Sequence, residues 1–192
     1  MPIFVSSSLN MNDFQLNPQW ILKALDGDAE ARHEIFNHTA DELMGVTYRY
    51  ANSMTQAEEW LVGGYVYLFL HWHTRKPGEL LRTWMRREMA IFCAKKCFLY
   101  ESPLITETTD RKLLDIKGRD LSGEELFFVL KALPISFRCI LNLYSVEGFS
   151  FNEIAKISGQ SPEEVAGQYT RGRLMMAKLL SVPEPLTDRK RG

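Results

Sequence analysis

Polar side chains that can read the edges of base pairs are spaced along residues 162–180. Arginine can donate two hydrogen bonds to guanine, glutamine can bond adenine in the same way, and glutamate can accept one from the cytosine amine. The candidates for such contacts are Glu164, Gln168, Arg171 and Arg173. An ordinary solvated helix surface is the open alternative for each of them. On a helix, these residues would allow contact with DNA in a groove.

A second set of candidate DNA contacts is basic. Residues 75–96 hold seven basic residues and two acidic ones, a net charge of +5, whereas residues 26–59 hold eight acidic and two basic ones, a net charge of −6. The whole chain has a formal charge of only −1. A basic segment in a neutral protein is typical of a local phosphate contact and equally of a solvated helix face. The candidates to hold a DNA strand are Arg75, Lys76, Arg82, Arg86 and Arg87.

Trp84 stands inside this basic segment. An aromatic ring there could stack on a displaced base, as aromatic side chains do in proteins that bind single strands. A tryptophan packed in the core is the alternative, and the usual burial of this residue favours it.

Residues for metal binding or bond chemistry form no recognisable constellation in the sequence. His71 and His73 stand two residues apart, so their rings would diverge on a helix, and Cys93 with Cys97 lacks the paired spacing of a zinc ribbon. A phosphate-cradling glycine loop, a nucleophile motif and a histidine–glutamate zinc helix are all missing from the sequence. We therefore expect no catalysis, no metal and no cofactor.

The elements that must position these side chains are helices, because apolar residues recur at three- and four-residue steps. One apolar stripe consists of Ile35, Leu43, Val46 and Tyr50. Thr55 and Glu58 stand in capping-box positions for a helix that we expect to run to about His73. The sequence predicts an all-α fold.

A change in composition at residues 100–122 predicts a linker, since this stretch is rich in threonine and charge and poor in apolar residues. We therefore expect two small helical domains, 18–99 and 123–181, on either side of it. The expected flanks are a disordered leader, 1–17, and a flexible tail, 182–192.

The capping residues on both sides of Gly159 predict a helix-turn-helix. Ser150 and Glu153 have the form of a capping box, in which each side chain satisfies a free N–H of the other residue. Ser161 and Pro162 then restart a helix, because serine caps well and proline costs nothing at the first helical position. The second helix of such a motif can lie in a major groove. The residues expected to face inward from it are Val165, Leu174 and Leu179.

The same stretch and its flanks resemble a known family. The matching segments are Leu133-Pro134, Phe137-Arg138, 146–150, 153–155, 159–161 and Val165. Together they resemble the promoter-binding C-terminal domain of a bacterial RNA polymerase sigma factor, and the short chain is typical of the extracytoplasmic-function group. By this resemblance, residues from Glu153 to Arg173 would recognise the upstream promoter element, with Gln160 and Ser161 among the contacts.

Residues 27–96 resemble the other domain of that family, the helical module that grips the polymerase and opens the downstream promoter element. The matching segments are Ala57-Glu58-Glu59, Tyr65-Val66, Phe69 and 81–85. By the resemblance, Glu58 and Glu59 would lie at the polymerase contact, and Trp84 would lie near a flipped promoter base. Val62 and Gly63 depart from the pattern, because the family usually carries glutamine and an acidic residue there.

The segment that carries these departures, residues 60–70, is apolar on every side of a helix. A helix packed on one face should be polar on the other, so this one is either buried all round or presents a contact surface. We favour burial on the general habits of apolar residues. In the other case Val62, Val66 and Tyr67 would bind a partner or a second copy of the chain.

We thus expect a cytoplasmic, sigma factor-like transcription initiation protein that binds core RNA polymerase and directs it to specific promoter DNA. An anti-sigma protein as regulator is implied by the resemblance alone. The odd number of cysteines, three, favours a reducing compartment, and the most apolar window, residues 60–70, is too short to span a bilayer. The alternative is a divergent sigma-like DNA-binding regulator or protein-interaction adaptor without productive polymerase docking. Val62, Gly63, Ala166 and Gln168 favour that alternative.

Overall fold

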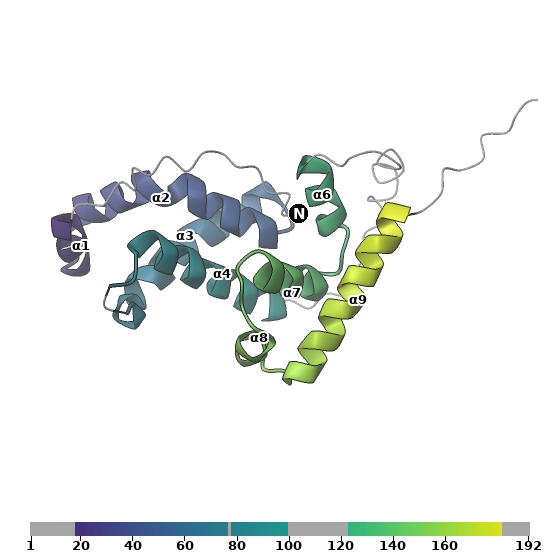
Figure 1. Ribbon diagram of the computed structural model, residues 1–192. Helices are drawn as coiled ribbons and strands as arrows, with labels where there is room; N and C mark the ends of the chain where they lie inside the picture. The colour runs from purple at the N-terminus through teal and green to yellow at the C-terminus, as the bar shows by residue number, and fades with distance from the viewer. Residues whose placement is uncertain (1–17, 77, 100–122, 182–192) are drawn as a thin grey trace, which may run out of the picture. The chain divides into compact units, whose positions relative to one another are not determined.

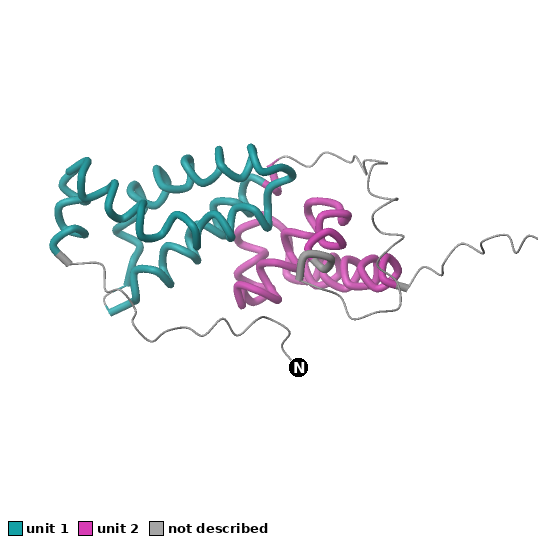
Figure 2. Tube along the Cα trace, turned by 90° about the horizontal axis from the view of Figure 1, so that it is seen from above, with its two compact units in different colours: residues 1–96 teal, residues 97–192 magenta. Residues whose placement is uncertain are grey.

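Helices are the regular elements of the computed structural model wherever it describes the chain, which is over residues 18–76, 78–99 and 123–181 (Figure 1). The predicted all-α class is confirmed. The expected leader, linker and tail fall outside the described residues. The chain divides into two compact units, residues 1–96 and 97–192, which are drawn in teal and magenta in Figure 2. Each unit is described by itself.

The first unit consists of helices that follow one another with short connections. They are α1 (Pro18–Leu25), α2 (Ala29–Tyr50), α3 (Met54–Leu70), the short 3₁₀ helix η1 (Trp72–Thr74) and α4 (Leu81–Leu99). Asp28 begins α2 by accepting a hydrogen bond from the Ala31 N–H at 2.8 Å. The predicted apolar stripe of α2 is confirmed, since its four residues are at most 1% exposed.

The start of α3 differs from the prediction. Ser53 is the capping residue and accepts from the Gln56 N–H at 3.1 Å, while Gln56 accepts from the Asn52 N–H at 2.6 Å. The capping box expected at Thr55 and Glu58 is therefore wrong by two residues. Both pairs have the same three-residue spacing, so the sequence pattern alone could not separate them.

The second unit consists of α6 (Gly123–Lys131), α7 (Ile135–Ser145), α8 (Phe151–Ser158) and α9 (Pro162–Ser181). The longest of these, α9, packs against the other three (Figure 1). Ile140, Ile154 and Val165 are fully buried where α7, α8 and α9 meet. Val129 of α6 packs against apolar residues from the end of α9. Cysteines are buried in both units, for example Cys93 in the first and Cys139 in the second.

The inward face of α9 is partly as predicted. Val165 is fully buried and Leu179 packs on Val129, so both expectations are confirmed. Leu174 is 59% exposed, and its predicted inward position is wrong. It follows Val165 by nine residues, which is about half a turn away around a helix. Gly172 takes the inward place, where a Cβ would come within 3.2 Å of the Phe137 Cβ.

Candidate nucleic-acid and partner interfaces

The turn between α8 and α9 is built from the capping residues that the sequence indicates. The Ser150 N–H donates to Glu153 Oε2 at 2.8 Å, and the Glu153 N–H donates to Ser150 Oγ at 3.3 Å, which completes the predicted capping box. Gly159 ends α8 with a φ of +73°, in the left-handed region that favours glycine. Two capped helices joined by a glycine turn are therefore present.

The start of α9 has a second reciprocal cap. The Ser161 N–H donates to Glu164 Oε2 at 2.8 Å, and the Glu164 N–H donates to Ser161 Oγ at 3.2 Å. The hydrogen bonds from Ser161 hold the pKa of the Glu164 carboxyl below its usual value, because they stabilise the charged form. A base contact through Glu164 would have to use the other carboxylate oxygen.

The four candidate base contacts of α9 do not lie on one side of the helix. Glu164 and Arg171 are seven residues apart, which places them on nearly the same side, whereas Arg173 lies about 160° around from Arg171. The Arg171 Nε donates to the Gly167 carbonyl at 3.3 Å, and the Arg173 guanidinium lies over the Tyr169 ring at 5.8 Å. The structure therefore brings Glu164 and Arg171 together and separates Arg173 from them.

The two glutamines of this region turn their amide oxygens inward. The Oε1 atoms of Gln160 and Gln168 are both buried and have no hydrogen-bond partner in the structure. As placed, neither oxygen can accept a hydrogen bond from adenine.

An aromatic cluster that the sequence analysis did not predict joins the three helices of the turn. Tyr144 of α7 stacks on Phe151 of α8 with ring centroids 4.5 Å apart, and Tyr169 of α9 lies 4.7 Å from Tyr144 and 5.5 Å from Phe151. Residues from three helices form it, so periodicity within one helix could not reveal it. Offset ring packing of this kind stabilises the orientation of α9.

In the first unit, the candidate basic residues Arg82 and Arg87 form internal ion pairs. Arg82 of α4 pairs with Glu42 of α2 at 3.0 Å and donates to the His38 carbonyl at 3.0 Å. Arg87 pairs with Glu79 at 2.8 Å and with Glu88 at 3.1 Å. The Arg82 guanidinium thus joins α4 to α2, whereas the Arg87 guanidinium is paired with residues of α4 and of the segment just before it.

The other basic candidates are less uniform. Arg75 donates to the Glu79 carbonyl at 2.6 Å and lies over the Trp72 ring at 5.9 Å. The Lys76 backbone N–H donates to the Glu79 carboxylate at 3.2 Å, and the Lys76 side chain is exposed. Arg86 is partly exposed. The basic segment is therefore no continuous row of exposed cations.

Trp84 is fully buried. Its indole Nε1 donates to Thr74 Oγ1 at 3.3 Å, and its ring meets Trp72 edge-on with centroids 5.3 Å apart. A buried ring cannot stack on a DNA base in this conformation. The structure therefore supports the core position of Trp84, which its usual burial favoured, over the stacking role.

The apolar helix α3 is buried on one face only. Its buried residues are Ala57, Trp60, Leu61, Gly64, Tyr65 and Leu68. On the opposite face Val62 is 63% exposed, Val66 58% and Leu70 69%. The favoured expectation of burial all round is wrong, because residues spaced by four follow the solvent side of the helix. We call this surface the outer face of α3, and it consists of Glu58, Glu59, Val62, Val66 and Leu70, all of them exposed.

Gly63 and Tyr67 lie beside the outer face, toward α4. A Cβ on Gly63 would come within 3.3 Å of the Phe92 ring, so glycine allows the two helices to approach. Tyr67 lies 5.5 Å from Phe92 and stacks on His71 at 3.9 Å. Burial and the neighbouring Glu88 carboxylate raise the pKa of Tyr67 to about 12. A side chain at Gly63 would therefore require a small shift of the Phe92 ring.

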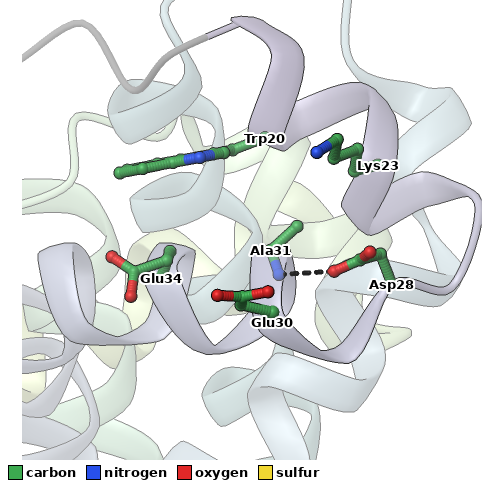
Figure 3. Close-up of a pocket in the computed structure, with 6 residues that line it drawn as sticks. All are labelled: Trp20, Lys23, Asp28, Glu30, Ala31 and Glu34. Atoms are coloured by element: carbon green, nitrogen blue, oxygen red, sulfur yellow. Dashed lines mark hydrogen bonds between the residues drawn. The ribbon is translucent and has the colours of Figure 1, made fainter.

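A shallow polar pocket of about 360 Å³ lies between α1 and the start of α2 (Figure 3). Its lining residues are Trp20, Lys23, Asp28, Glu30, Ala31 and Glu34. Asp28 is already used as the cap of α2, as the dashed line in Figure 3 shows. Over the described ranges, histidine, cysteine and acidic side chains form no group of three or more that could hold a metal ion.

None of the helices within residues 18–76, 78–99 and 123–181 combines the length and the apolar character that a membrane-spanning helix needs.

Similarity to known proteins is found only at the level of structure. No protein-family model matches the sequence, and no curated protein sequence matches it. The sigma factor RpoE from Bartonella quintana, solved with the anti-sigma factor NepR, has a TM-score of 0.50 and 15% identity, covering 78% of this chain and 96% of that one. CnrH, solved with the cytosolic domain of CnrY, has a TM-score of 0.46 and 15% identity, covering 85% of this chain and 96% of that one. The predicted resemblance to a sigma factor is confirmed for the fold.

Proposed function

We propose that this chain, which has the fold of a sigma factor, is a cytoplasmic sigma factor-like transcription initiation protein of the extracytoplasmic-function type. It would bind core RNA polymerase and direct it to specific promoters. The observation that carries the proposal is the pair of capped helices, α8 and α9, joined by the turn at Gly159 within that fold. A helix presented in this way fits a major groove. The protein would act by binding and would catalyse no bond chemistry.

Arg171 is the proposed direct reader of the upstream element. It lies on the same side of α9 as Glu164, and its side chain is exposed. Arg171→Ala should weaken specific DNA binding by about 1–3 kcal/mol if the guanidinium bonds a base. Fluorescence anisotropy with a duplex selected by the wild-type chain measures this. An affinity that stays the same would remove Arg171 from the base contacts.

The outer face of α3 is the proposed docking surface for the polymerase. An exposed apolar row with two carboxylates at its border has the composition of a protein contact surface rather than of a solvated helix. The sigma factor of similar fold was solved with an anti-sigma factor, and this favours a protein regulator for the present chain as well.

Run-off transcription with purified core RNA polymerase and a genomic promoter library tests the proposal. Discrete transcripts should require the chain. Val62→Glu combined with Val66→Glu should abolish both transcription and retention on core enzyme, because two charges would be buried at the contact. Leu22→Glu on α1 is the matched control, since Leu22 and Val62 are both 63% exposed. Wild-type chain that neither binds core enzyme nor yields a transcript would contradict the proposal.

The internal contacts made by the basic segment, residues 75–96, favour a second function. Arg82 and Arg87 form internal ion pairs and Trp84 is buried, so these three side chains are already engaged within the first unit and are not directed to a melted strand. The chain would then be a DNA-binding regulator or an adaptor that associates through the outer face of α3. Sedimentation of the chain alone and with core enzyme separates the two functions. Self-association without binding of core enzyme supports the second.

A further inference from the structure

We propose that Gly167 is the point where α9 comes closest to DNA, and that the absence of a side chain there is required for binding. This proposal rests on the proposed DNA-binding function of α9 and adds a positioning residue to it. The glycines inside the described helices differ in what surrounds them, and Gly167 stands apart.

A glycine inside a helix destabilises it relative to alanine, so a retained glycine needs a compensating reason. Packing supplies that reason at three positions. A Cβ on Gly63 would meet the Phe92 ring at 3.3 Å, a Cβ on Gly64 would collide with the Met89 sulfur, and a Cβ on Gly172 would meet Phe137 at 3.2 Å. In each case another helix occupies the space that a side chain would take.

Packing supplies no such reason at Gly167. A Cβ there would meet only the Arg171 Nη2, at 3.8 Å, which is an ordinary contact distance. Gly167 follows the fully buried Val165 by two residues, so a methyl group would point about 160° away from the core direction. The second unit itself would therefore accept alanine. A methyl group would project toward whatever α9 contacts.

The position of Gly167 along α9 distinguishes it from a glycine that is merely open to solvent. Gly45 of α2 also has nothing within 4 Å of a Cβ, so an open glycine by itself indicates no function. Gly167, however, lies in the second turn of the helix that follows the glycine turn, and the early turns of such a helix are the ones that reach base edges. It also lies between Glu164 and Arg171 on the outward side.

Arg171 adds a second observation at the same place. Its Nε donates to the Gly167 carbonyl at 3.3 Å, so the guanidinium lies along the bare backbone instead of extending outward. The surface of α9 therefore has no side chain of its own at Gly167, and the Arg171 guanidinium lies beside this position. Such a surface lets the backbone approach a base pair while the arginine turns to guanine or phosphate.

The test compares Gly167→Ala with Gly45→Ala in the full chain. Duplexes are first selected from a random pool by the wild-type chain, alone and with core RNA polymerase, and affinities are then measured by fluorescence anisotropy over a range of salt concentrations. Both variants should melt at higher temperature in far-UV circular dichroism, because each replaces an open helical glycine by alanine. Gly167→Ala should raise the DNA dissociation constant at least tenfold, and Gly45→Ala should leave it within twofold.

The salt dependence identifies the cause. Gly167→Ala should keep the wild-type slope, since no phosphate contact is removed, whereas Arg171→Ala should reduce the slope by about 0.9 if it neutralises a phosphate. Wild-type affinity in Gly167→Ala would overturn the role of Gly167 and leave the proposed function intact. A wild-type chain that selects no duplex, with or without polymerase, would overturn both.

Discussion

Single residues that are suited to DNA recognition by type are often used to hold helices in place. Glu153 and Glu164 close capping boxes, and Arg82 closes an ion pair with Glu42. The caps could be predicted from sequence because their partners stand three residues apart. The ion pair could not, since its partners are separated by forty residues and only the packing of α4 on α2 brings them together.

The pH dependence of stability follows from Glu164. Its carboxyl has a lowered pKa in the folded chain, so its stabilising contribution is complete above the unfolded pKa and is lost as pH falls through the folded one. We expect Glu164→Gln to be less stable than wild type near pH 7 and the difference to vanish in strong acid. Urea midpoints at several pH values measure this, with Glu163→Gln in the same turn as control. A difference that grows toward acid would contradict the assigned hydrogen bonds.

Ser150 gives a prediction about the first cap of the turn. Ser150→Ala removes the acceptor for the Glu153 N–H and should lower the free energy of unfolding by about 1 kcal/mol. Lys156→Ala, at an exposed position of the same helix, is the control and should have little effect. Urea denaturation followed by far-UV circular dichroism measures both variants. Equal stability of Ser150→Ala and wild type would mean that the cap contributes nothing.

At the scale of elements, helix type and ends were easier to predict than helix orientation. The apolar stripe of α2 and the start of α9 followed from spacing and capping residues, which are local signals. The expectation that α3 is buried on all sides is wrong, because residue type alone does not show which apolar residues of a helix face solvent. Leu174 was predicted wrongly because Gly172 carries no apolar signal, although it is the residue that packs against α7.

Arg82 gives a prediction about the contact between α2 and α4. Arg82→Ala removes one ion pair and one hydrogen bond to a carbonyl and should cost about 1 kcal/mol, since the pair is about one-third exposed and is screened by solvent. DNA affinity should remain unchanged if the guanidinium is structural. Urea denaturation by tryptophan fluorescence and anisotropy with a selected duplex test the two parts. Lost affinity with unchanged stability would restore Arg82 as a DNA contact.

For the whole molecule, the distribution of tryptophan allows the two units to be followed separately. All four tryptophans, Trp20, Trp60, Trp72 and Trp84, lie in residues 1–96. Tryptophan fluorescence therefore reports the first unit, while far-UV circular dichroism reports helices of both. This spectroscopic separation exists because the sequence places the large indole side chains in one unit only.

The two units should unfold with separate transitions. Each is compact by itself, so we expect the fluorescence and circular dichroism midpoints in urea to differ. Arg82→Ala should shift the fluorescence midpoint, and Ser150→Ala should shift only the dichroism. Coincident midpoints in wild type and in both variants would show that the units unfold as one.

Because the side chains of Cys93 and Cys139 are buried, the rate at which a thiol reagent labels them reports how often each unit opens. A maleimide cannot react with Cys93 or Cys139 while the surrounding helices are closed, since both side chains are fully covered. Mass spectrometry of the labelled peptides would then give one opening rate for α4 and another for α7 under native conditions. The same shielding should slow the reaction of these two thiols with peroxide in the folded chain.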